Sequence, residues 1–340
     1  MNDIAAAEPS VIATRQGRVG HILLNRPRTL NALDIAMIRT IAGALNAWRD
    51  DPAVHGVVIE GAGERAFCAG GDIRAVRDSA VAGDRAAIAA FFTEEYGLNA
   101  LIAEYPKPYI ALITSLCLGG GIGISVHGRI RVTTEGGLFA MPETAIGMFP
   151  DVGTSFMLPR LPGTLGMYLG LTGTRLAGAD AVHAGIATHF VPGEALPALR
   201  DRIFSDGPAA VATYARTLPP FSLAPYREAI DRCFSAPDVA GIIAALQAER
   251  TDWARATLAA LLSMSPSAVL WSFEIIRRGA GRGLRECLAA ELELTGRVTA
   301  HPDFVEGVRA MVVDKDRQPQ WTPMRIEDVD LAAIGRMFAA

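Results

Sequence analysis

The sequence contains little cysteine and almost no lysine, and both shortages restrict what the protein can be. Lysine occurs only at Lys107 and Lys315 among 340 residues, so nearly all 32 basic side chains are arginine. No basic block is present and the formal net charge is −4, which disfavours a nucleic-acid-binding surface. The four cysteines have no CxxC spacing, which favours free thiols in a reducing compartment over a disulfide framework.

Long hydrophobic runs and several well-known motifs are also missing. No stretch reaches the roughly 18 apolar residues of a membrane helix, and the first residues do not resemble a signal peptide. There is no GxxxxGK[ST] phosphate loop and no HExxH metal spacing. A loose GxGxxA match at residues 61–66 is followed by a segment that resists helix formation. We therefore expect a cytoplasmic protein without a metal, a membrane or a nucleic-acid partner.

The order of apolar and turn residues predicts a strand-rich first part and a helical second part. The predicted strands are residues 11–15, 19–24, 57–60, 109–113, 129–134, 138–140 and 188–191. The predicted helices are residues 33–50, 86–105, 119–127, 165–171, 239–248, 252–262, 267–278, 284–298 and 304–313. The sequence thus indicates an α/β core over residues 11–205 and a helical C-terminal region over residues 206–340 that packs on it.

Two glycine clusters occur at similar places in this pattern. One is Ala66-Phe67-Cys68-Ala69-Gly70-Gly71-Asp72-Ile73 and the other is Leu118-Gly119-Gly120-Gly121-Ile122-Gly123. Each follows a predicted buried strand and opens a predicted helix, where backbone N–H groups lack partners. Two such groups aimed at one point would form an oxyanion hole. The alternative is that the glycines only permit close helix–strand packing.

Two acids, Glu143 and Asp151, lie eight residues apart among apolar and small residues. A carboxyl group in such surroundings has a raised pKa unless it is paired, and this suits acid, base or nucleophilic chemistry. The alternative is a helix cap and a turn residue.

These motifs together resemble the enoyl-CoA hydratase/isomerase (crotonase) superfamily. Within it, several long runs resemble the subgroup that hydrolyses 3-hydroxyisobutyryl-CoA. These runs are FFTEEYGLN, GGGIGISVHGRIRV, FAMPETAIGMFPDVG, LTGTRL, AGIATHFV and HPDFVEGVRAMVVDKDRQPQW. The resemblance covers residues 11–325 and implies a crotonase-like spiral of ββα turns with a helical C-terminal region.

The resemblance also implies roles for individual residues. Gly71 and Gly120 match the oxyanion-hole donors, and Glu143 and Asp151 match the catalytic acids of the hydrolase subgroup. Glu95, Gly120, Glu143 and Asp151 match its substrate-binding positions. The loop that matches the CoA-binding side contains Ala69, Gly70, Asp72, Ile73 and Arg74.

The implied activity is hydrolysis of a short 3-hydroxyacyl-CoA, with 3-hydroxyisobutyryl-CoA of valine breakdown as the expected substrate. CoA enters as part of the substrate, so no separate cofactor is expected, and a homo-oligomer is possible. The hydratases carry a second glutamate where this chain has Gly123, and a glycine cannot hold a proton. An enoyl-CoA hydratase or isomerase and a non-catalytic CoA-binding protein are the alternatives. The chain departs from the subgroup at Thr154, Ser155 and Leu270.

Overall fold

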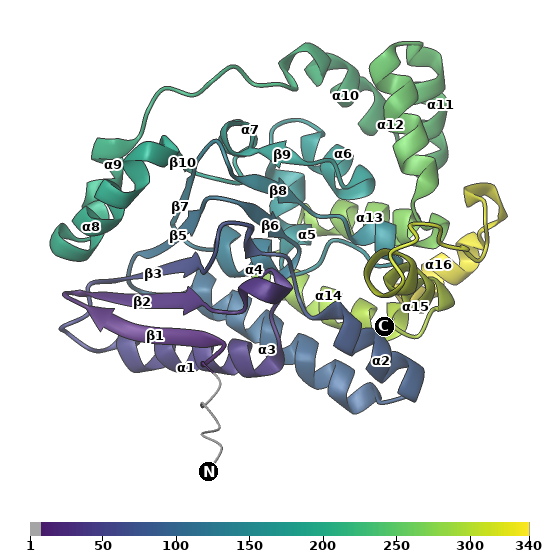
Figure 1. Cartoon of the computed structure of the whole chain (residues 1–340). Helices are drawn as coiled ribbons and strands as arrows, with labels where there is room; N and C mark the ends of the chain where they lie inside the picture. Colours follow the sequence, from purple (N-terminus) through teal and green to yellow (C-terminus); the bar gives the residue numbers. More distant parts are fainter. Residues whose placement is uncertain (1–7, 340) are drawn as a thin grey trace.

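The computed structural model describes residues 8–339, which fold around two β-sheets (Figure 1). The larger sheet has the strand order β1-β2-β3-β5-β7-β10, and the smaller has the order β4-β6-β8-β9. The strands of the larger sheet are β1 (Val11–Gln16), β2 (Val19–Leu24), β3 (Gly56–Gly61), β5 (Tyr109–Ile113), β7 (Ile130–Thr133) and β10 (His189–Phe190). Those of the smaller sheet are β4 (Ala66–Cys68), β6 (Leu116–Leu118), β8 (Leu138–Ala140) and β9 (Leu176–Ala177).

Successive strand pairs are shared between the two sheets. The hairpin β1–β2 is antiparallel, and from β2 onward the larger sheet is parallel. After each of β3, β5 and β7 the chain contributes one short strand to the smaller sheet, namely β4, β6 and β8, which run parallel to one another. The same strand-pair unit thus occurs three times, as expected for a spiral of ββα turns.

Sixteen α-helices surround the sheets within the described residues. The first half contains α1 (Ile35–Arg49), α2 (Ile73–Ala82), α3 (Arg85–Ala103), α4 (Gly120–Val126), α5 (Thr154–Met157), α6 (Leu165–Thr172) and α7 (Gly178–Ala184). The remainder contains α8 (Leu196–Asp206), α9 (Val211–Tyr214), α10 (Arg227–Phe234), α11 (Val239–Glu249), α12 (Asp252–Ser263), α13 (Pro266–Gly279), α14 (Leu284–Val298), α15 (Pro302–Val308) and α16 (Leu331–Met337). A π-helix over Arg309–Val313 follows α15 directly.

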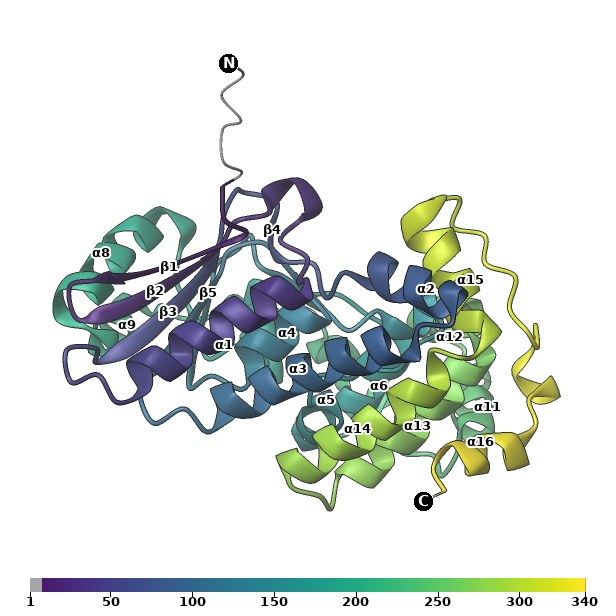
Figure 2. The same cartoon turned by 90° about the horizontal axis from the view of Figure 1, so that it is seen from below.

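The amphipathic helices cover the sheets because their apolar faces need burial. In α1, Met37, Ile38, Ile41 and Leu45 recur at helical spacing and are buried, and the Asp34 side chain caps the helix by accepting from the Met37 amide. A second, smaller apolar cluster lies where α8 and α9 cover one flank of the larger sheet (Figure 1). From the other side, α14 lies beside α3 (Figure 2), and this contact brings the C-terminal region against the core.

The structure corrects several predicted elements. The glycine clusters do not follow the predicted strands directly, because the short strands β4 and β6 intervene. Both strands lie directly beside the glycine clusters, whose residues mark turns in the sequence. The predicted helix over residues 304–313 is divided between α15 and the π-helix. Within residues 8–339 no single helix is long and apolar enough to cross a membrane; α12 and α13 reach that length and composition only as a pair bent by 107°.

Candidate active site

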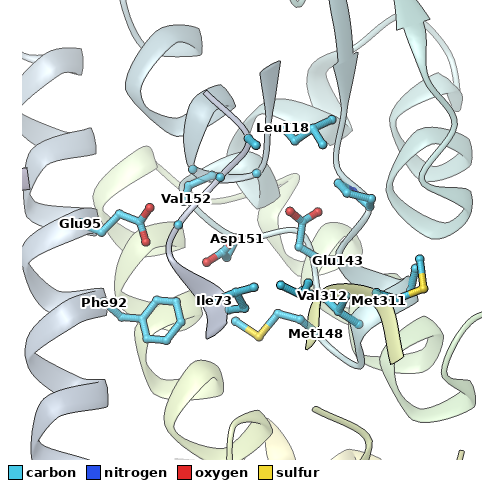
Figure 3. A pocket seen from close by; sticks show the side chains of 18 of the residues that line it. Ile73, Phe92, Glu95, Leu118, Glu143, Met148, Asp151, Val152, Met311 and Val312 are labelled. Carbon is cyan, nitrogen blue, oxygen red and sulfur yellow. The ribbon is translucent and has the colours of Figure 1, made fainter. Parts of the chain in front are cut away.

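A cavity of about 270 Å³ lies where the two glycine clusters and the segment from Pro142 to Val152 meet. Figure 3 shows the carboxylates of Glu95, Glu143 and Asp151 around it. The rest of its lining is mainly apolar. These apolar lining residues include Ile73, Phe91, Phe92, Leu118, Met148, Val152, Met311 and Val312.

The two glycine turns are adjacent because they leave neighbouring strands. β4 and β6 pair in parallel, so both turns emerge at the same edge of the smaller sheet. A Cβ on Gly120 would lie 3.0 Å from the Gly71 nitrogen, and one on Gly70 would lie 3.7 Å from the Gly120 nitrogen. Among residues 8–339, neither the Gly71 nor the Gly120 amide donates a hydrogen bond to a backbone acceptor. Two adjacent amides at the cavity wall are therefore free to receive an oxygen atom.

Glu143 begins a short 3₁₀-helix (Glu143–Ile146) and points toward the second glycine cluster. Its Oε1 would lie 2.7 Å from a Cβ on Gly119, whose φ of +47° also favours glycine. Only 7% of Glu143 is exposed, and its Oε2 has no hydrogen-bond partner. Burial, and then the charge of Asp151, raise the pKa of Glu143 well above its ordinary value. The carboxyl group is thus buried beside the paired glycine amides.

Asp151 is the most firmly held of the three acids. Its Oδ2 accepts a hydrogen bond of 2.7 Å from the Tyr96 hydroxyl, and the Thr295 hydroxyl lies 3.0 Å from the same Tyr96 oxygen. Burial raises the pKa of Asp151 to about 6, and the Tyr96 hydrogen bond acts in the opposite direction. Asp151 therefore titrates close to neutral pH, where it can gain or lose a proton during a reaction.

Glu95 projects from α3 toward the amide of Gly120. Its Oε1 would lie 2.5 Å from a Cβ at position 120, so any larger residue there would displace it. Glu95 is 2% exposed and its Oε1 is unpartnered. Burial, and then Asp151, raise its pKa well above the ordinary value. The three neighbouring acids oppose each other's ionisation, which adds to the effect of burial on the pKa of Glu95 and Glu143.

Gly123 faces Val152 and not open space. A Cβ on Gly123 would lie 2.6 Å from the Val152 Cβ and 2.9 Å from Asn99 Nδ2. Val152 has a φ of +53°, and its carbonyl oxygen accepts a hydrogen bond of 2.7 Å from His127 Nε2. The volume beside position 123 is therefore already filled by a side chain that the backbone holds in place.

The residues predicted for the CoA-binding side are found in different environments. Ala69, Gly70 and Ile73 line the cavity, whereas the Asp72 carboxylate caps α2 and faces Arg26 at 3.4 Å. Arg74 is exposed on α2 and is not part of the lining. The cavity's cationic side chain is Arg175, which is exposed and makes no salt bridge among the described residues.

Neither Arg175 nor the role of Tyr96 was predicted from the sequence, although both lie inside runs that carry the resemblance. Met311 and Val312 complete the cavity wall from about 160 residues beyond Asp151 in the chain, and they were not predicted either. Their residue types are ordinary for a helix that packs on a core. Leu270, one of the departures from the subgroup, lies on α13 near α16 and away from this cavity. Within residues 8–339, no group of three or more His, Cys, Asp or Glu side chains could hold a metal ion.

Sequence and structure comparisons identify the family. Residues 19–338 match the model of the enoyl-CoA hydratase/isomerase family, so the chain belongs to this family. A solved structure described as a carnitinyl-CoA dehydratase from Mycobacterium thermoresistibile has a TM-score of 0.93 at 39% identity, covering 97% of this chain and 96% of that one. The predicted crotonase-like fold with a helical C-terminal region is thereby confirmed.

Curated relatives carry a more specific name. A mitochondrial 3-hydroxyisobutyryl-CoA hydrolase from Xenopus tropicalis is 45% identical, covering 100% of this chain and 91% of the relative. The protein of the same name from Homo sapiens is 42% identical, covering 98% and 89%. The resemblance to this hydrolase subgroup is confirmed.

The prediction of a cytoplasmic location is wrong by the same comparison. The relatives from Xenopus and human are named as mitochondrial proteins. The prediction used the lack of a hydrophobic signal segment, and that criterion concerns secretion and does not distinguish the cytoplasm from an organelle.

Proposed function

We propose that this protein hydrolyses the thioester of a short 3-hydroxyacyl-CoA, with 3-hydroxyisobutyryl-CoA of valine breakdown as the expected substrate. The observation that supports this best is the position of Glu143. Its carboxylate lies against Gly119, next to the paired amides of Gly71 and Gly120, inside a cavity with two further acids. The full-length relatives named as hydrolases of this thioester support the same substrate.

The paired amides would act on the thioester oxygen. When a nucleophile adds to the carbonyl carbon, negative charge moves to that oxygen, and the N–H groups of Gly71 and Gly120 would stabilise it as an oxyanion hole. These donors belong to the backbone of turns fixed by neighbouring strands, so they need no rearrangement during the reaction. Losing one such donor in known enzymes costs about 2.7–4 kcal/mol.

Glu143 would act in one of two ways. As a nucleophile, its carboxylate attacks the thioester carbon and forms a mixed anhydride. The C–S bond breaks in this step, and CoA leaves as a thiol after protonation. Water then hydrolyses the anhydride. As a general base, Glu143 takes a proton from water, which attacks the thioester carbon directly. Both routes yield a free 3-hydroxy acid and CoA.

Asp151 would orient the substrate's 3-hydroxyl group or transfer a proton. It lies in the same cavity as Glu143, and the Tyr96 hydroxyl fixes its Oδ2. With a pKa of about 6, it can accept a hydrogen bond from a hydroxyl when ionised or donate a proton when neutral. Glu95 would bind the substrate beside Gly120.

The second candidate function is hydration of an enoyl-CoA, because one solved neighbour is described as a dehydratase. Addition of water across a double bond in this family uses a second glutamate at the position of Gly123. Here a Cβ at that position would collide with Val152. The local packing therefore favours the hydrolase over the hydratase.

Thiol release distinguishes these functions. We expect free CoA from 3-hydroxyisobutyryl-CoA and 3-hydroxypropionyl-CoA in the parent, and a loss of at least about 100-fold in Glu143→Gln. Asp151→Asn should show a severe loss too. Loss of enoyl absorbance from crotonyl-CoA without thiol release would instead establish a hydratase. Binding of CoA with no turnover of any of these thioesters would establish a non-catalytic member.

Isotope labelling separates the two roles of Glu143. A single turnover in ¹⁸O-water is followed by mass analysis of the peptide that contains Glu143. Label in its carboxylate supports the anhydride, because water then attacks the Glu143 carbonyl carbon. Label confined to the released acid over repeated turnovers supports the general base.

A further inference from the structure

Glu291 is a buried acid that the proposed reaction does not use. It lies on α14 and has no exposed surface. Its carboxylate accepts hydrogen bonds from the Gly153 amide at 2.7 Å, from the Ser155 amide at 3.0 Å and from the Ser155 hydroxyl. Burial raises the pKa of Glu291 to about 8, and these hydrogen bonds act in the opposite direction. Burying a carboxyl group costs free energy unless the group is hydrogen-bonded, and these three donors satisfy that need.

The donors belong to the N-cap and the first turn of α5, a helix without a side-chain cap of its own. Its N-cap is Gly153, which has a φ of +81°. A Cβ there would lie 2.6 Å from His127 Nε2, so a capping serine, threonine or aspartate is excluded at this position. Glu291 supplies from α14 the acceptor oxygens that the N-cap residue lacks.

The capped turn is directly connected to Asp151. Val152 and Gly153 both have positive φ, which glycine adopts readily and a β-branched valine rarely does. His127 holds the Val152 carbonyl, and Glu291 holds the Gly153 amide. The backbone that leaves Asp151 is therefore fixed at the next two residues.

The same helix is also linked to the Asp151 side chain, through Tyr96. Thr295 lies one turn after Glu291 on α14, and its hydroxyl bonds to the Glu291 carbonyl oxygen at 2.8 Å. Thr295 Oγ1 is also 3.0 Å from the Tyr96 hydroxyl, which donates to Asp151. One face of α14 thus supports both the Asp151 backbone and its hydrogen-bond donor.

We infer that Glu291 is a positioning residue, which holds the Asp151–Ser155 turn by capping α5 and so places Asp151 against the substrate. This inference rests on the proposed function, since it gives Asp151 a substrate to act on. Ser155, one of the departures from the subgroup, has a role in this arrangement because its hydroxyl is the third donor to Glu291.

The test compares Glu291→Gln with Glu293→Gln, an acid-to-amide control at an exposed position of the same helix. Two amide donors and a hydroxyl need two acceptor oxygens, and glutamine offers only one. For 3-hydroxyisobutyryl-CoA we expect kcat to fall about 10- to 100-fold in Glu291→Gln with KM changed less than about threefold. Ser155→Ala should lower kcat by a smaller factor, and it covers the case in which Glu291→Gln does not fold.

A second measurement does not depend on catalysis. Hydrogen exchange of the peptide spanning residues 148–157 should become at least about 10-fold faster in Glu291→Gln and remain unchanged in Glu293→Gln. Unchanged exchange and unchanged kcat in Glu291→Gln and Ser155→Ala would overturn the inference. A parent protein that releases no thiol would contradict the proposed function alone, and faster exchange would still establish the capping role.

Discussion

At the scale of single residues, the site combines one exposed cation with three buried acids. Arg175 lies at the cavity and makes no salt bridge among the described residues, while Glu95, Glu143 and Asp151 lie inside it. The phosphates of CoA carry several negative charges that a cavity of carboxyl groups would repel. We therefore predict that Arg175 binds the CoA part of the substrate and that the three acids act on the acyl part.

Arg175→Ala should raise KM for CoA thioesters about 5- to 30-fold and leave kcat within twofold, because the interaction is the same in the ground and transition states. Steady-state thiol release gives both constants. Arg74→Ala is the matched control, since Arg74 is exposed on α2 outside the lining. If Arg74→Ala raises KM and Arg175→Ala does not, the CoA part follows α2, as the family resemblance implies.

Gly123→Ala should lower both the melting temperature and activity. The added Cβ would lie 2.6 Å from the Val152 Cβ, and overpacking of this kind costs about 1–3 kcal/mol, against a gain of about 1 kcal/mol in helix propensity. Gly123→Ala combined with Val152→Gly should recover part of the lost stability, because the clash with Val152 is removed and glycine adopts a φ of +53° without strain, while the contact with Asn99 Nδ2 at 2.9 Å remains. Thermal unfolding of the parent, the single and the double variants measures this. An equally stable Gly123→Ala would contradict the packing argument.

At the scale of elements, α3 places two functional groups side by side in sequence. Glu95 approaches Gly120, and Tyr96 donates to Asp151. Both side chains are buried because α3 lies between the core and α14 (Figure 2). This double contact makes α3 the element that joins the glycine turns to the Asp151 turn.

Tyr96→Phe should shift the acidic limb of the pH–rate profile to higher pH. The Tyr96 hydrogen bond lowers the pKa of Asp151, which burial raises to about 6, so removing it raises that pKa further. If Asp151 acts ionised, activity declines below about pH 6 in the parent and at a higher pH in the variant. The measurement is kcat/KM against pH.

Tyr105→Phe is the control for this shift, since the Tyr105 hydroxyl donates to the Leu45 carbonyl. If the acidic limb of the pH–rate profile is unchanged in Tyr96→Phe, a group other than Asp151 controls it.

The sequence predicted elements better than contacts between elements. The predicted helix over residues 284–298 coincides with α14, because its caps and apolar spacing are local signals. The strands β4 and β6 were missed because each is short and runs directly into a glycine cluster, which reads as a turn in the sequence. The role of Glu291 was not predictable either: a single acid on an amphipathic helix looks solvated until α5 is seen to lie against it. Glu143 and Asp151 were found because they stand out among apolar neighbours.

At the scale of the whole molecule, the buried acids link catalysis to stability. Burial raises the pKa of Asp151 from 3.8 to about 6, so the folded protein binds a proton at pH 5 that the unfolded chain releases. Its contribution to stability is complete below about pH 4 and is lost as the pH rises through about 6. The carboxylates thus make the protein less stable at the pH where they are needed.

Asp151→Asn should therefore be more stable than the parent at pH 8, by an amount on the order of 1–3 kcal/mol, and close to it at pH 4. Chemical denaturation at the two pH values gives the free energies of unfolding. Asp201→Asn, at an exposed position, should show no such difference. A parent that is more stable than Asp151→Asn at pH 8 would show that Tyr96 compensates fully for the buried charge.

The contact between Gly123 and Val152 has a consequence for how this lineage can diversify. A glutamate at position 123 would need the valine to be replaced first, while that replacement alone opens a gap beside Asp151 and adds no new chemistry. The two positions are therefore epistatic, and no single-step mutational path leads from this active site to a two-glutamate one. Such a transition would have to change both positions.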